Sequence, residues 1–541
     1  MKVFFALCAA LLTASTASAQ TAGQGAETLP LTLEEAVRRA IDNNPDLAVV
    51  RLSSQADAAR VAESESAYTP IFSTQLGSAG NIAPPSNFLL GERGVDTKDL
   101  FTSTGVRQRL AKGGGTWLVS WDTSRTTSNS PLTSFDPTLQ SGFQVAFSQP
   151  LLKDRRMDAA KQQRIIAMRN LESSELRGRE SAVQTAAAVK QAYWTLKATV
   201  ANVAVQQRSL ELAQELARQN KARVDVGQTP PLDLLQAEAE VARRRENLIL
   251  ANAATGDAED RLRRLIMDPS DASFWRARLN PTDEPIIGGP LPDVDAVATG
   301  TFSERYDLAR AKKDLENIST SAEFLRDQKL PDVRLETSYR GNGLGGTQLL
   351  RTGTFPGTIT GTLNRSYGNV LGQMFDRSYP TWSVGLTISY SLGRSFEEAG
   401  LARTQVEHRQ GVQRIASLQL QIAETIRRAA RQVISTAERI EAARAGAAMN
   451  EQRVTTEQRR YDVGLSTSFL VTQAQRDLLQ AQVNLLQATL DHQSARVNFE
   501  ALQQAPELAN GQALDLRGPT IVPLQAPEPR GLFRPGASTG F

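Results

Sequence analysis

The chain carries few side chains suited to covalent or metal chemistry. It has two histidines, His408 and His492, and a single cysteine, Cys8. The histidines lie far apart on predicted helices, where we expect both on solvated faces. Gly113-Gly114-Gly115 lacks the Lys-Ser/Thr that completes a phosphate-binding loop, so it predicts a turn. We therefore expect no catalytic residues, no cofactor and no metal site, and we do not expect an enzyme.

The charge balance excludes one further class of partner. Among 541 residues, Lys and Arg number 61 and Asp and Glu number 58, which gives a formal net charge of +3. Such a chain has no basic excess for gripping phosphate backbones, and we expect no nucleic-acid partner.

Residues 1–19 have the features of a secretory signal peptide. Lys2 precedes an apolar run over residues 3–12, and Ala17-Ser18-Ala19 fits the small-residue cleavage rule. Cleavage would remove Cys8, so no cysteine would remain for lipid attachment or a disulfide. The apolar run is too short to be a membrane anchor. We therefore expect the chain to be exported.

Two very long helices are predicted, from about Arg156 to Val226 and from about Glu397 to Val463. Each carries apolar residues at seven-residue spacing, a pattern that indicates supercoiling against neighbouring helices. The ladders are Val189, Leu196, Val203, Leu210, Ala217 and Val224 in the first helix, and Ile426, Val433, Ile440, Ala447, Val454 and Tyr461 in the second.

The two ladders are 237 residues apart, and the match continues past their ends. Val226-Gly227 corresponds to Val463-Gly464, and Gln236-Ala237 to Gln473-Ala474. A match this regular predicts an internal duplication, each copy reading helix, strands, long helix, sharp turn and helix. The domains expected are a first repeat over 20–267, a linker over 268–292, a second repeat over 293–503, and a Pro-rich, disordered periplasmic tail over 504–541.

A strand is predicted from Trp382 to Leu392, where apolar and small polar residues alternate without a fault. A soluble sheet with one face on a core would give the same alternation. The apolar faces of the predicted helices, however, pack against other helices and cannot also cover the sheet. Lipid can cover the apolar face of the strands, so a membrane barrel is favoured. Few such strands occur in one chain, so a barrel with a pore requires several copies. The residues expected to face lipid are Trp382, Val384, Leu386, Ile388 and Tyr390.

These features together resemble the TolC family of outer-membrane factors, the exit ducts of tripartite efflux pumps and type I secretion systems. The resemblance covers about residues 30–502. It rests on the order and double occurrence of short motifs: Leu31-Thr32-Leu33-Glu34-Glu35-Ala36, Asn44-Pro45-Asp46-Leu47, Tyr68-Thr69-Pro70, Ser148-Gln149-Pro150-Leu151-Leu152, and Arg460-Tyr461-Asp462-Val463-Gly464-Leu465-Ser466-Thr467 followed by Gln473-Ala474.

The resemblance implies a mixed α+β membrane protein. It implies a homotrimer in which four strands per subunit complete one shared outer-membrane β-barrel, continued across the periplasm by a long α-helical barrel. Implied partners are other copies of the chain, outer-membrane lipids, a periplasmic adaptor (membrane fusion) protein and an inner-membrane transporter. Residues 100–149 depart from this pattern, because 101–110 and 117–124 predict an additional hairpin, which puts the strand count in doubt.

The resemblance also implies site residues at the helix-hairpin tips. Adaptor contacts would be Val226, Gly227, Gln228, Thr229, Val463, Gly464, Leu465 and Ser466, although these glycines can equally serve only to end helices. Asp233 and Tyr461 match positions that latch a closed gate, and the alternative is a surface Asp and a heptad Tyr that never meet. The family's ring of aspartates does not carry over, since Leu470 and Gln473 stand in its place.

The function expected is a passive conduit from a periplasm-spanning pump to the exterior, in the outer membrane. The alternative is a soluble periplasmic coiled-coil adaptor or scaffold. An adaptor would have one long hairpin between β-domains, whereas two equivalent hairpins are predicted. The sequence leaves the cargo and the type of pump open.

Overall fold

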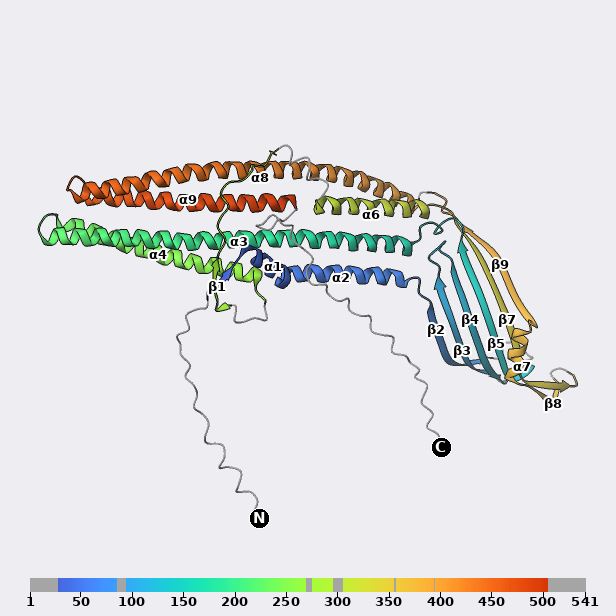
Figure 1. Ribbon diagram of the computed structural model, residues 1–541. Helices are drawn as coiled ribbons and strands as arrows, with labels where there is room; N and C mark the ends of the chain where they lie inside the picture. Colours follow the sequence, from blue (N-terminus) through green and yellow to red (C-terminus); the bar gives the residue numbers. More distant parts are fainter. Residues whose placement is uncertain are drawn as a thin grey trace, which may run out of the picture. The chain divides into compact units, whose positions relative to one another are not determined.

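The computed structural model describes residues 28–84, 94–268, 275–294, 305–354, 357–393 and 395–504. The predicted signal peptide and nearly all of the predicted tail lie outside these residues. The chain divides into two compact units (Figure 1). Unit 1 comprises Met1–Val50, Arg179–Arg305 and Gln421–Phe541, and unit 2 comprises Arg51–Gly178 and Tyr306–Leu420.

Unit 1 is built from helical hairpins. The helices α3 (Ala159–Asp225) and α4 (Pro231–Ile266) form one hairpin, and α8 (Phe396–Asp462) and α9 (Ser468–Gln503) form the other. The first parts of α3 and α8 belong to unit 2. Unit 1 also contains α1 (Leu33–Asn43) and the short parallel strands β1 (Thr28–Leu31) and β6 (Arg278–Pro281).

The two hairpins repeat each other in length. Helices α3 and α8 both have 67 residues, and α4 and α9 both have 36. Corresponding helices begin 237 residues apart, the offset seen in the sequence. The observed ends of α3 and α8 lie within three residues of the predicted ones, because the heptad pattern and the glycine turns are local signals.

Heptad residues form the core of unit 1. Val189 and Leu196 are fully buried in a cluster with α1, whose N-terminus is capped by a hydrogen bond from the Glu35 N–H to the Thr32 hydroxyl (3.2 Å). In the second hairpin Ile426 and Ile440 are buried in the same way. The long helices are thus held by apolar seams, as a supercoiled pair requires.

The expectation for His492 was wrong. This side chain is only 3% exposed, and its Nδ1 lies 3.1 Å from the Thr436 hydroxyl. Burial lowers the pKa of its imidazole. The histidine fills a polar position in the α8–α9 seam, a role that spacing along the chain does not reveal. His408, by contrast, is half-buried.

Unit 2 contains a seven-stranded antiparallel sheet. Its remaining helices are α2 (Pro45–Ser66, from Arg51 on), α6 (Tyr306–Gln328) and α7 (Tyr367–Phe375). The strands are β2 (Ile71–Ala83), β3 (Val95–Arg109), β4 (Thr116–Ser128), β5 (Phe135–Pro150), β7 (Asp332–Thr352), β8 (Thr358–Arg365) and β9 (Tyr379–Ser389).

The additional hairpin predicted within residues 100–149 is confirmed as β3 and β4. The sheet runs β2-β3-β4-β5-β7, and β8 and β9 both pair with β7. The four strands implied by the resemblance are therefore too few. The predicted strand Trp382–Leu392 is displaced by three residues, because pairing of β9 with β7 begins at Tyr379 and ends at Ser389. Tyr390 consequently lies just past the strand.

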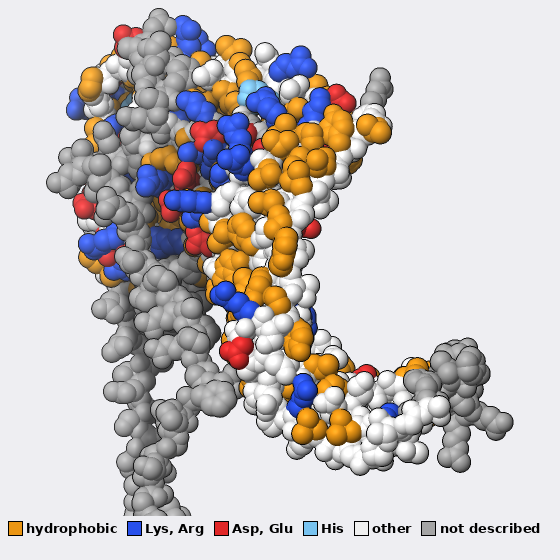
Figure 2. Space-filling view, turned by 90° about the vertical axis from the view of Figure 1, so that its right-hand side faces the viewer, with side chains coloured by type: hydrophobic (Ala, Val, Ile, Leu, Met, Phe, Trp, Pro, Cys, Tyr) orange, Lys and Arg blue, Asp and Glu red, His pale blue; other side chains and the backbone are white. Residues whose placement is uncertain are grey.

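The register places apolar residues on one face of the sheet. Trp121 pairs with Phe143, and Tyr339 pairs with Trp382, so these aromatic side chains share a face. The opposite face is polar and holds an ion pair between Arg340 and Asp122. Hydrophobic side chains gather along the strands in Figure 2, with few charged ones between them. The sheet is thus two-sided, with an apolar face and a polar one.

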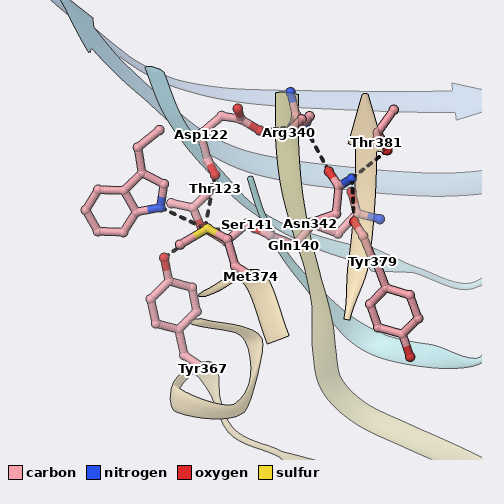
Figure 3. A network of polar contacts seen from close by, with 11 residues as sticks. Asp122, Thr123, Gln140, Ser141, Arg340, Asn342, Tyr367, Met374, Tyr379 and Thr381 are labelled. Atoms are coloured by element: carbon pink, nitrogen blue, oxygen red, sulfur yellow. Dashed lines mark hydrogen bonds and ion pairs between the residues drawn. The ribbon is translucent and has the colours of Figure 1, made fainter. Parts of the chain in front are cut away.

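Helix α7 packs on the apolar face, over a track of glycines in β7. A Cβ atom at Gly341 or Gly345 would lie 2.5 Å from Met374 O or a Val370 methyl, and one at Gly343 would overlap the Val370 carbonyl oxygen. Polar contacts lie beside this track: the Tyr367 hydroxyl donates to that of Thr123 (3.0 Å; Figure 3). The Trp121 indole donates to the Ser141 hydroxyl (2.8 Å). The glycines let the helix lie directly on the strand.

Candidate functional site

The turns at the two hairpin tips have the same geometry. Gly227 and Gly464 adopt φ values of +74° and +77°, in the left-handed region that favours glycine. Around Gly227, the Gln228 N–H donates to Arg223 O (2.8 Å) and the Gly227 N–H to Val224 O (2.9 Å). Equivalent bonds surround Gly464. Each is a Schellman motif, in which the last carbonyls of a long helix are satisfied as the chain reverses.

The tips expose apolar side chains. Val226 is 67% exposed, Val463 70% and Leu465 72%. Gly227, Gln228 and Gly464 are also exposed, whereas Thr229 and Ser466 are half-buried. Ser466 donates to the Glu457 carboxylate (2.8 Å), which fixes the second turn. An exposed apolar tip on a rigid turn can contact another protein, and it is equally compatible with a turn that only ends a helix.

Behind the turns, a buried network joins the two hairpins. The Tyr461 hydroxyl donates to Asn220 Oδ1 (2.5 Å), and Asn220 Nδ2 donates to the backbone oxygen of Asp233 (3.2 Å). The Arg223 guanidinium lies 4.0 Å from the centre of the Tyr461 ring and donates two hydrogen bonds to Tyr461 O (3.2 Å each). Tyr461 also packs against Leu216 and Val471.

Asp233 and Tyr461 are therefore neighbours, and Asn220 connects them. In the described part of the chain the Tyr461 hydroxyl reaches Asp233 through the Asn220 amide, at the backbone of Asp233 and not at its carboxylate. Burial raises the pKa of Tyr461, and the charges of Arg223 and Asp233 act on it in opposite directions. The phenol thus stays protonated and remains a donor.

Asn220 and Arg223 are functional candidates that the sequence reading did not identify. Asn220 sits three residues after the ladder position Ala217, on the second apolar seam of the heptad, yet it is 1% exposed. A lone amide at such a position is a signal of a specific buried contact. Arg223 carries no comparable signal, because its partner Tyr461 lies 238 residues away along the chain.

A second polar cluster lies further from the tips, around Glu240. The carboxylate of Glu240, 5% exposed, contacts Arg244 (2.6 Å) in its own helix and Arg476 (2.6 Å) in α9. Burial alone would raise the pKa of Glu240, but the hydrogen bond from Arg476 and the charges of Arg244, Arg476 and Arg243 outweigh it and lower that pKa. The carboxylate stays ionised and ties α4 to α9.

The two clusters flank a pocket of about 240 Å³, lined by residues that include Asn220, Asp233, Glu240, Phe469 and Arg476. The arrangement binds helix to helix, through Asn220 between α3 and α4 and through Glu240 between α4 and α9. Among the described residues, no group of three or more His, Cys, Asp or Glu side chains is placed to hold a metal ion. Within those same residues, no helix is long and apolar enough to cross a membrane.

This chain matches a known protein family in sequence and known structures in fold. The outer membrane efflux protein family matches residues 118–266 and 301–504. The outer membrane efflux protein BepC of Brucella suis biovar 1 (strain 1330) is 26% identical over 298 residues, which are 53% of this chain and 56% of that protein. The chain therefore matches a little over half the length of this curated relative.

Solved structures share the fold at low identity. A membrane protein from Pseudomonas aeruginosa is 16% identical, with a TM-score of 0.62, over 87% of this chain and 92% of its own. The Campylobacter jejuni CmeC outer membrane channel is 14% identical, with a TM-score of 0.63, over 87% and 85%.

Proposed function

The chain belongs to the outer membrane efflux protein family, and on that premise we propose that it is the outer-membrane exit duct of a tripartite efflux pump or type I secretion system. In this function the chain is a homotrimer that conducts cargo passively from a pump to the exterior. The strands cross the outer membrane, and the helices extend into the periplasm. The observation that carries the proposal is the two-faced sheet: aromatic and aliphatic residues line one face, and polar residues line the other.

The two faces fit a barrel wall between lipid and water. Val384, Leu386 and Ile388 alternate along β9 and are 65%, 56% and 64% exposed. Helix α7 covers part of the apolar face, including Gly341–Gly345. The apolar side chains that α7 leaves exposed need an apolar solvent, because soluble proteins rarely expose large contiguous apolar patches to water. Lipid provides that solvent, and the polar face would then line the conduit.

The hairpin tips would bind the pump's periplasmic adaptor protein. Val226, Val463 and Leu465 provide an exposed apolar contact surface, held by the two Schellman turns. The Tyr461–Asn220–Asp233 chain of hydrogen bonds would latch the hairpins together in the resting state. An adaptor that binds the separated hairpins more tightly would shift the equilibrium toward the open duct. The inner-membrane transporter would supply the cargo.

Charge substitutions on β9 test the lipid-facing assignment. Ile388→Asp places a carboxylate on the apolar face, whereas Thr387→Asp, its neighbour, places it on the polar face. We expect Ile388→Asp to abolish assembly in the outer membrane and Thr387→Asp to preserve it. A charge on the lipid-facing side of a barrel strand destabilises the barrel, because the carboxylate loses its hydration there. Equal outer-membrane yields of the two variants would refute the duct and favour a scaffold in the periplasm.

A further inference from the structure

The sheet has more membrane-length strands than the resemblance implies. Strands β2, β3, β4, β5, β7 and β9 have 13, 15, 13, 16, 21 and 11 residues, and each reaches the 9–11 residues that cross an outer membrane. Strand β8 does not belong to this set. It pairs with β7 only over Gly346–Thr352, beyond the stretch Asp332–Asn342 where β9 pairs. At the level of β9 the wall therefore has six strands.

The β3–β4 hairpin shares the two-faced character of the strands around it. Val119 of β4 pairs with Val145 of β5, and Val106 of β3 pairs with Val119, so one apolar row crosses all three strands. On the other face, Ser120 pairs with Gln144 and Gly105. A hairpin outside the membrane would not need an apolar row on one face and a polar row on the other. Its sequence is thus that of barrel wall.

The two outer edges are compatible with each other. The chain runs in alternating directions through β2, β3, β4, β5, β7 and β9, since each neighbouring pair is antiparallel. Strand β9 therefore runs opposite to β2, and β9 of one copy can pair with β2 of the next without breaking the alternation. In lipid, unpaired backbone edges are excluded, so another copy of the chain is the partner that both edges require.

We propose that the shared barrel has eighteen strands, six from each of three copies, in place of the twelve that four per subunit would give. This inference rests on the proposed trimeric duct. At a strand spacing of about 4.8 Å and a tilt of about 40°, the backbone diameter rises from about 24 Å for twelve strands to about 36 Å for eighteen. The outer-membrane part of the conduit is then wide, and selection by size falls to the hairpin tips.

Thiol labelling in intact membranes tests whether the additional hairpin is in the wall. The one cysteine, Cys8, lies within the expected signal peptide, so introduced cysteines report alone. In β4 we compare Ser120→Cys, on the polar face, with Val119→Cys, on the apolar face. With a membrane-impermeant maleimide we expect at least a tenfold faster reaction at Ser120→Cys. The same comparison in β5, Gln144→Cys against Val145→Cys, is the benchmark.

The labelling contrasts in β4 and in β5 together distinguish an error in the number of strands from an error in the proposed membrane barrel. A contrast in β5 with equal, fast labelling of both β4 cysteines would place the hairpin outside the wall and overturn the eighteen strands. Loss of the contrast in both strands would refute the membrane barrel itself. Electron cryomicroscopy of the full chain in lipid nanodiscs then counts strands directly, and eighteen are expected. Twelve, whether from two copies or from a wall without β3 and β4, would overturn the proposal.

Deleting residues 95–128 provides a second test. It removes β3 and β4 and retains 84–94 and 129–134 as a connection from β2 to β5, which still run in opposite directions. The deleted form is expected to make a twelve-stranded barrel. If it assembles, particles should show a barrel narrower by about one third. An unchanged barrel diameter would contradict the inference.

Discussion

The Tyr461 hydroxyl donates a 2.5 Å hydrogen bond to Oδ1 of Asn220, and this contact joins the ends of two long helices, α8 and α3. Both side chains are almost completely buried, at 2% and 1% exposed. The Asn220 amide in turn donates to the Asp233 backbone in α4, so three helices meet through one residue. Because a buried polar group that loses its partner keeps its full desolvation penalty, this contact is sensitive to removal of either side chain.

Tyr461→Phe should loosen the hairpin tips. The substitution leaves Asn220 Oδ1 buried without its donor, at a cost of about 1–3 kcal/mol, and this shifts the balance between joined and separated tips about 5- to 150-fold. Spin labels at Val226 and Val463 would show a broader and longer distance distribution. Tyr193→Phe is the matched control, because its hydroxyl contacts Leu31 O and Asp283 away from the tips. Unchanged distances in Tyr461→Phe would exclude the latch.

Acid should weaken the attachment of α4 to α9 through Glu240. Its pKa in the folded chain is lowered from the ordinary value of 4.5. The stabilisation by the ionised carboxylate is therefore full above that value and is lost as pH falls through the lowered pKa. Spin labels on α4 and α9 should separate as the pH falls below 4.5, and Glu240→Gln should already be separated at pH 7. Equal distances in Glu240→Gln and the parent at pH 7 would contradict this reasoning.

Gly227→Ala and Gly464→Ala should each fray a tip. A Cβ atom at either position meets nothing within 4 Å, so the cost is backbone strain from the positive φ, about 1–2 kcal/mol. Hydrogen exchange of the amides in the adjoining helix ends should accelerate about five- to thirtyfold. Gly446→Ala, inside α8 and equally uncrowded, should instead protect its helix by about 0.5–1 kcal/mol. Equal behaviour of all three would show that the turns carry no strain.

Gly343→Ala should displace α7 from the sheet. The added methyl would overlap the Val370 carbonyl oxygen, which belongs to the backbone and cannot rotate away. Met374 is 4% exposed, and a cysteine at this position should become reactive to maleimides when Gly343 is replaced. Gly385→Ala, in β9, meets nothing within 4 Å and should leave that cysteine protected. Protection in both backgrounds would mean that α7 tolerates the methyl.

What the sequence predicted well depends on neighbours along the chain. The ends of α3 and α8 and the turns at Gly227 and Gly464 are set by heptads and glycines within a few residues. The β3–β4 hairpin was visible for the same reason, since its alternation and its glycine turn are local. The family resemblance implied four strands per subunit, whereas the local alternation predicted an additional hairpin. The structure agrees with the local alternation.

What the sequence missed depends on contacts between distant segments. His492 is buried because Thr436, 56 residues away, lies against it. Helix α7 was not foreseen, since the glycines that receive it sit on another element and glycine alternation resembles a poor strand. The Arg223–Tyr461 contact spans 238 residues, and only the packing of the two hairpins brings it together. The resemblance implied a contact between Asp233 and Tyr461, but the sequence did not indicate that Asn220 lies between them.

The pairing of β5 with β7 has a consequence for how the chain is made. Strand β5 ends at Pro150 and β7 begins at Asp332, with the whole α3–α4 hairpin between them. A loop of that length must close before the pairing brings any gain, and such long-range closure is slow. Until then, β2–β5 form an incomplete sheet with two open edges and an apolar face. The exported chain therefore needs protection from aggregation until the second half has followed the first.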